Sequence, residues 1–114
     1  MAADLDATLA ALADPARRAI VELLLRDPAR PSEVADALAL SRPAISRHLR
    51  VLRQAGLVEQ GAGEDDARAR PITLRHEPFA QLRDWIEEVE AFWGDQLAAF
   101  KSYAERKHGK GRRR

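Results

Sequence analysis

The stretch SRPAISRHLRVLRQAGLVE, residues 41–59, is the most informative part of this chain of 114 residues. Its first sixteen residues contain four arginines and one histidine but no aspartate or glutamate. If each residue of a helix advances by about 100°, Leu49 and Leu52 fall on the same side as Ile45. We therefore predict an amphipathic helix that buries these three aliphatic side chains and exposes a basic face.

This basic face consists of Pro43, Arg47, Arg50 and Gln54, with Ser46 and Arg53 on its flank. A planar guanidinium group can donate two parallel hydrogen bonds to a guanine edge or to a phosphate. Because the helix offers no acid of its own, the pattern favours double-stranded DNA as the partner, whereas a solvated helix face is the alternative interpretation. We expect His48, beside the apolar stripe, to be a packed or hydrogen-bonded residue at the edge of the core, with a phosphate contact as the alternative.

The flanking segments complete an order of elements that is typical of one fold. A short helix opening at Ser32 precedes the basic helix, which Ser41 caps and Gly56 ends. Two short strands, at 57–60 and 71–75, then enclose a polar, glycine-rich loop. Helix, tight turn, helix and hairpin predict a mainly α winged helix-turn-helix fold with about five helices and a two-stranded β-hairpin wing.

Further helices are expected on both sides of this motif. Leucines at helical spacing predict a helix from Leu5 to near Ala13, and Asp14 followed by proline predicts a second one ending near Arg26. Apolar residues keep three-and-four spacing from Phe79 to Tyr103, which predicts a long helix at about 78–107. We expect residues 1–107 to form one domain and residues 108–114 to form a flexible basic tail.

Composition limits the class of protein. The chain has a net charge of +1 and no cysteine, which excludes disulfides, thiolate metal sites and a cysteine nucleophile. Its first ten residues lack the basic start and apolar core of a secretory signal, and no apolar run approaches membrane-spanning length. We therefore predict a soluble cytoplasmic protein that does not enter a membrane.

The long last helix carries more aromatic residues than a small domain can cover. A two-fold pairing with a second copy would bury them and would also place two basic helices about one DNA turn, roughly 34 Å, apart. The alternatives are that the aromatic side chains cover the core of their own subunit or line a ligand pocket. The residues predicted for the dimer interface are Leu5, Leu9, Trp85, Val89, Phe92, Trp93 and Phe100.

The basic stretch resembles the recognition-helix signature of the ArsR/SmtB family of bacterial winged-helix repressors, and LADPARRAIVELL, residues 12–24, is similar to the N-terminal segment of that family. The likeness extends from about Leu5 through Arg75, and the last helix resembles the dimerisation helix of a subgroup that does not sense metals. The resemblance implies a DNA-binding regulator in which Arg50 contacts phosphate. It implies groove contacts for Ser41, Arg42, Pro43, Ser46 and Arg47.

The chain departs from the family pattern in two places. Many members bind metals through cysteines or histidines, but this chain has no cysteine and no histidine between Phe79 and Lys107, so we expect no metal or other cofactor. The loop between the strands contains three adjacent acids at 64–66, which would repel phosphates. Arg68, Arg70 and Arg75 are expected to contact the DNA backbone, with solvated loop charges as the alternative.

We predict a homodimeric repressor that binds an inverted-repeat operator. A winged-helix module that binds an acidic protein is the alternative, and the sequence leaves open a small-molecule effector. Catalysis is not expected, because the sequence contains no phosphate-binding glycine loop and no nucleophile elbow.

Overall fold

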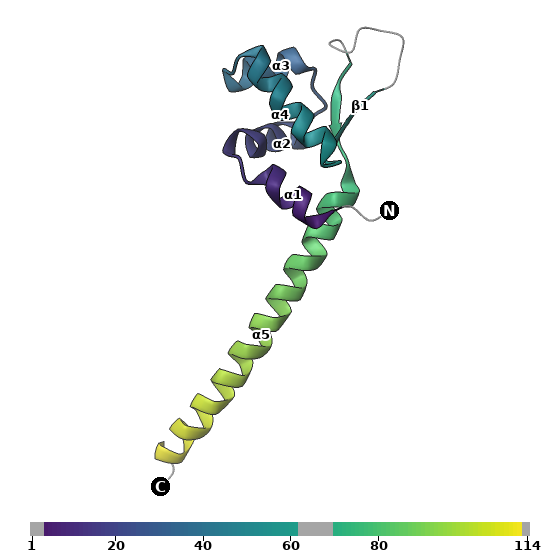
Figure 1. The fold of residues 1–114 in the computed structure, drawn as a ribbon. Coiled ribbons are helices and arrows are strands. Elements are labelled where there is room, and N and C mark those ends of the chain that lie inside the picture. Colours follow the sequence, from purple (N-terminus) through teal and green to yellow (C-terminus); the bar gives the residue numbers. More distant parts are fainter. Residues whose placement is uncertain (1–3, 62–69, 113–114) are drawn as a thin grey trace. The chain divides into compact units, whose positions relative to one another are not determined.

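The computed structural model describes residues 4–61 and 70–112, with side chains described as far as residue 107. The chain divides into two compact units, one up to Leu82 and one from Arg83 onward, and each is described by itself. Within the described residues the elements are mainly helical, as predicted, and none of the helices is long and apolar enough to cross a membrane. In chain order they are α1 (Leu5–Leu12), α2 (Pro15–Arg26), α3 (Pro31–Leu38), α4 (Arg42–Gln54), β1 (Val58–Gln60), β2 (Ile72–Leu74) and α5 (His76–Arg112) (Figure 1).

Carboxylates cap the first two helices. Asp4 Oδ1 accepts a hydrogen bond from the N–H of Asp6 at 3.0 Å, and Asp14 Oδ1 accepts from the N–H of Ala16 at 2.8 Å. These bonds satisfy amide groups that have no partner inside the helix. The ends predicted for α1 and α2 are confirmed to within one residue.

Helix α3 begins two residues before the position expected from the sequence. Its N-cap is Arg30 and its first residue is Pro31, whereas Ser32 was predicted to be the cap. The carboxylate of Glu33 accepts a hydrogen bond from the N–H of Arg30 at 2.8 Å, so a side chain from within the helix satisfies this amide. Ser32 is therefore a residue of the first turn.

A tight turn joins α3 to α4, as the sequence predicts. Ala39 adopts a left-handed conformation with φ of 54°, which lets the N–H of Leu40 donate to the carbonyl of Ala35 at 3.1 Å. Ser41 Oγ then accepts from the N–H of Ala44 at 3.2 Å and caps α4. The two helices of the motif are consequently linked by residues 39–41 alone.

The two strands form an antiparallel ladder in which Val58 pairs with Leu74 and Gln60 with Ile72. Gly56, with φ of 79°, reverses the chain between α4 and β1, as predicted for a glycine at a helix end. Ile72 also forms an isolated bridge with Ala29 in the segment before α3. This bridge ties the hairpin to the helical motif.

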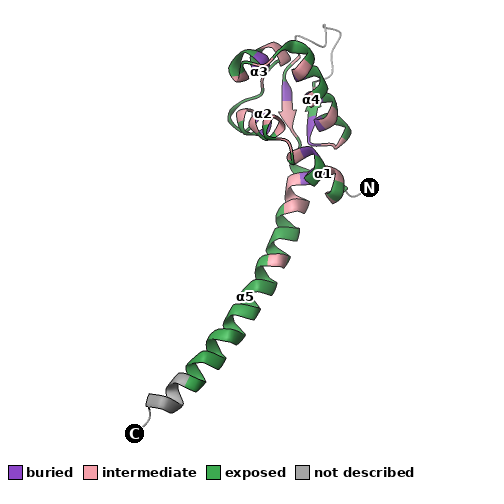
Figure 2. Cartoon of the chain, turned by 60° about the vertical axis from the view of Figure 1, so that its left-hand side comes forward, coloured by how far each residue is buried: buried purple, intermediate pink, exposed green. Residues whose placement is uncertain are grey.

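One apolar core lies among the helices and the hairpin of the first unit, as the burial colours of Figure 2 show. Phe79, in the first turns of α5, packs against it. The buried residues of this core are Ala11, Ile20, Val21, Leu24, Val34, Ala35, Ile45, Leu49, Leu52, Leu57, Val58 and Ile72.

Helix α5 is longer at both ends than predicted. It begins at His76 instead of about residue 78, because Pro78 is tolerated within the first helical turn. It continues to Arg112, so the boundary expected at residue 107 falls inside the helix. From Arg83 to Lys107 the side chains are exposed, except for the half-buried Val89.

Candidate nucleic-acid interface

Three aliphatic side chains hold α4 in the core. Ile45 and Leu49 are each 2% exposed and Leu52 is fully buried. These are the three residues that the helical spacing predicted, and their burial sets the orientation of the whole helix. The basic face of α4 consequently points to solvent.

The side chains of this face are exposed to solvent, and its arginines form no ion pair with a described residue. Within residues 4–61 and 70–112, the structure gives none of the α4 arginines a carboxylate partner. An unneutralised cluster of guanidinium groups attracts polyanions. The predicted DNA contacts that lie exposed on or at the start of α4 are Ser41, Arg42, Pro43, Ser46, Arg47 and Arg50.

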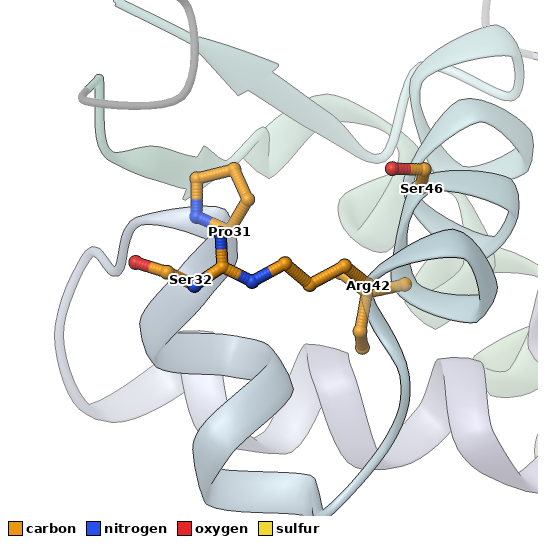
Figure 3. A pocket seen from close by; sticks show the side chains of 5 residues that line it. Pro31, Ser32, Arg42 and Ser46 are labelled. Carbon is orange, nitrogen blue, oxygen red and sulfur yellow. The ribbon is translucent and has the colours of Figure 1, made fainter.

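A shallow cavity of about 80 Å³ lies between the start of α3 and the start of α4. Its lining includes Pro31 and Ser32 from α3 and Arg42 and Ser46 from α4. Figure 3 shows the side chain of Arg42 extending from α4 toward Ser32. A hydroxyl group and a guanidinium group thus line one cavity, a combination that suits an oxyanion.

Ser32 is a site residue that the sequence did not single out. This serine was interpreted as the helix cap, so its hydroxyl group was assigned to a backbone amide of its own helix. The available signal was the proline before it, because proline favours the first helical position and leaves the next residue inside the helix.

His48 lies half-buried at the edge of the core, as predicted. Arg17 Nη1 lies 3.5 Å from His48 Nδ1, while Arg17 Nε donates to the carbonyl of Ala11 at 2.7 Å. Arg17 therefore links the end of α1 to α4. The importance of this arginine was not foreseen, because its partners are 6 and 31 residues away in the chain.

The carboxyl group of Asp14 lies beside this link. Partial desolvation acts to raise its pKa, but the N–H groups of Ala16 and Arg17 and the charges of Arg17 and His48 outweigh that effect. The pKa of Asp14 is consequently held below its ordinary value. An ionised Asp14 both caps α2 and faces the Arg17 guanidinium, with Oδ2 at 3.8 Å from Nη1.

The hairpin arginines differ from those of α4. Arg70 is half-buried, and its carbonyl accepts a hydrogen bond from Gln60 Nε2 at 2.9 Å. Arg75 is exposed and lies 3.7 Å from a carboxylate oxygen of Glu77. Arg68 and the acids at 64–66 lie outside the described residues, so the predicted contacts of this loop stay predictions.

The residues predicted for the dimer interface are solvent-accessible in each unit. In α1, Leu9 is 40% exposed and Leu5 is half-buried. In α5, Val89 is half-buried, and the aromatic residues are exposed to fractions between 42% and 70%. These aromatic residues are Trp85, Phe92, Trp93 and Phe100. Within the described part of the chain, no three histidine, aspartate or glutamate side chains lie close enough to hold a metal ion.

Known proteins are similar to this chain in sequence and in fold. Residues 14–60, which span α2 to β1, match the family model described as "Bacterial regulatory protein, arsR family". The HTH-type transcriptional regulator Rv2034 of Mycobacterium tuberculosis is 53% identical over 91 residues, which cover 79% of this chain and 78% of that protein. The HTH-type transcriptional regulator NmtR of the same organism is 37% identical, over 73% of this chain and 67% of that protein.

A solved structure agrees with this sequence match. An ArsR-like transcriptional regulator from Rhodococcus sp. RHA1 superimposes with a TM-score of 0.72 at 31% identity, covering 88% of this chain and 92% of that one. These relatives are transcriptional regulators, a different class from enzymes, in agreement with the prediction. The chain belongs to the ArsR family of bacterial regulatory proteins.

Proposed function

We propose that this DNA-binding transcriptional regulator is a homodimeric repressor that acts in the cytoplasm and recognises an inverted repeat in promoter DNA. The observation that carries the proposal is the exposed basic face of α4, whose arginines have no carboxylate partner among the described residues. A repressor bound across a promoter would block access of the polymerase.

The contacts divide by geometry into base recognition and backbone positioning. Ser46 and Arg47 lie exposed on α4, where they would meet base edges in the major groove, and Arg50 would meet a phosphate. Arg42 extends toward Ser32 across the cavity, and this pairing suits a backbone phosphate better than a base edge. The wing arginines Arg68 and Arg70 would add contacts to the backbone.

A second copy would complete the site. An inverted repeat has two half-sites, and a two-fold dimer places one α4 at each. The exposed apolar residues of α1 and α5 would form such an interface. We propose that no metal takes part in this function, because the chain has no cysteine. The repressor either responds to an unidentified small molecule or acts without an inducing signal.

Selection of bound fragments from random duplex DNA tests the proposal. Sequencing of the retained fragments should reveal an inverted repeat with half-sites about one helical turn apart, roughly 10 base pairs. A matched sample with Arg47→Ala and Arg50→Ala should retain little DNA and enrich no motif. If the wild-type protein enriched no motif and retained an acidic protein instead, the protein-interaction alternative would replace this function.

A further inference from the structure

The guanidinium group of Arg17, in the first turn of α2, is held by the end of α1. Its Nε donates to the carbonyl of Ala11 at 2.7 Å, and its Nη2 donates to the carbonyl of Ala10 at 3.3 Å. Both carbonyls lie in the last turn of α1, where the usual N–H partner four residues further on is missing. The side chain of Arg17 is 17% exposed, so these bonds leave the guanidinium group little freedom to move.

The third nitrogen of this guanidinium group faces α4. Nη1 lies 3.5 Å from His48 Nδ1, at the long end of the hydrogen-bond range, and 3.8 Å from Asp14 Oδ2. A guanidinium group only donates hydrogen bonds, so His48 Nδ1 must accept, which requires the ring proton to be on Nε2. A doubly protonated ring would bring a second cation against Arg17. The contact therefore needs the neutral form of His48.

This contact gives α4 an orientation that its apolar contacts do not define as sharply. Ile45, Leu49 and Leu52 bury α4 in the core, but hydrophobic burial has no preferred direction. With its side chains a helix has a radius of about 5–6 Å, so a rotation of about 20° moves its outer atoms by about 2 Å. His48 directly follows Arg47 in the chain. A shift of this size would break hydrogen bonds between Arg47 and a base edge.

We propose that Arg17 is a positioning residue for DNA recognition, which fixes the rotation of α4 through His48 and thereby the direction in which Arg47 enters the major groove. This inference rests on the DNA-binding function proposed above and adds a specificity-determining residue outside the basic face. Loss of a phosphate contact lowers the affinity for every duplex, whereas loss of orientation lowers the preference for the operator. The preference between two duplexes is therefore the quantity to measure.

Matched variants separate positioning from helix capping. Arg17→Ala removes both the bonds to α1 and the contact with His48. Arg18→Ala removes the same charge and a similar bond, from Nη1 to the carbonyl of Leu12 at 2.8 Å, but within the described residues no hydrogen bond or ion pair joins Arg18 to α4. His48→Asn keeps an acceptor near the position of Nδ1, whereas His48→Leu keeps the bulk without an acceptor.

Fluorescence anisotropy would give the affinity of each full-length variant for the selected operator and for a duplex with the same bases in shuffled order. The ratio of the two affinities should fall about tenfold in Arg17→Ala and in His48→Leu, as expected when one base contact is misplaced. It should stay close to the wild-type ratio in Arg18→Ala and His48→Asn. The double variant should lose no more than either single variant, because both changes break the same contact.

Equal losses in Arg17→Ala and Arg18→Ala would overturn the proposal, since Arg17 would then only cap α1. Equal losses in His48→Asn and His48→Leu would also overturn it, because His48 would then act through Nε2. If Arg17→Ala does not fold, the two His48 variants decide the question, since they leave the bonds between Arg17 and α1 in place. A wild-type protein without preference for the operator would overturn the proposed function itself, whereas a preference that survives in His48→Leu would overturn the positioning role alone.

Discussion

Arg47 shows how helical spacing predicts the side of a helix on which a charged group lies. Its position opposite Ile45 follows from helical spacing, and burial of Ile45 to 2% exposure fixes the side on which the guanidinium group lies. The sequence was sufficient for this residue because the apolar and basic positions of α4 are both local. Arg17 could not be assigned in the same way, since its contacts to Ala11 and His48 arise only when α1, α2 and α4 pack together.

Replacement of Arg47 by alanine should weaken binding to the selected operator by about 1–3 kcal/mol and relax the preference at one base position. The loss follows from the removal of paired hydrogen bonds to a base edge. Fluorescence anisotropy on the operator and on single-base variants would measure both effects. Arg83→Ala is the matched control, because Arg83 already pairs with Asp84 at 3.2 Å, and it should bind normally. Equal losses on all duplexes would show that Arg47 contacts only the backbone.

At the scale of elements, caps and prolines made most helix starts predictable, whereas a competing local cap at α3 and one long-range bridge were missed. Asp14 and Ser41 cap α2 and α4 as expected. The start of α3 moved because Glu33 bonds to the backbone of Arg30, a competing cap that the pattern around Ser32 did not reveal. The bridge between Ala29 and Ile72 was also not predicted, since it joins segments 43 residues apart with no local signal.

The cap of α2 should make stability depend on pH. The pKa of Asp14 is lowered in the folded chain, so its contribution is fully present above the unfolded pKa, about 4, and is lost as the pH falls through the lower folded value. Asp14→Asn keeps a capping oxygen without the charge, and its melting temperature should fall less between pH 5 and pH 2.5. Glu33, whose pKa is lowered chiefly by the N–H of Arg30, would leave part of the acid sensitivity in place. If the melting temperatures of the wild type and of Asp14→Asn fell equally between pH 5 and pH 2.5, the role of Asp14 would be refuted.

At the scale of the whole molecule, the sequence predicted a fold class that the structure and the family confirm. The winged helix-turn-helix order was visible because each element has its own periodicity and its own end signal. The dimer stays a prediction, since a single chain displays exposed aromatic residues but not their partner.

Replacement of the large aromatic side chains of α5 by alanine should therefore shift the protein toward the monomer. Phe92 and Trp93 contact each other edge to face, with centroids 5.6 Å apart, and both are more than half exposed. Replacing either by alanine should weaken association by about 2 kcal/mol or more, as is usual for a central aromatic residue of an interface. Sedimentation velocity would detect the change, and Glu87→Gln, on the opposite side of the helix, should remain dimeric. A Trp93→Ala variant with unchanged dimer affinity would argue against this interface.

The most direct test of the central claim is the affinity of the protein for its selected duplex as a function of salt concentration. If the exposed arginines of α4 bind DNA, the logarithm of the association constant should fall linearly with the logarithm of the salt concentration, and Arg50→Ala should reduce the slope by about 1. Binding that did not respond to salt, or an unchanged slope in that variant, would contradict the claim that this face holds the phosphate backbone.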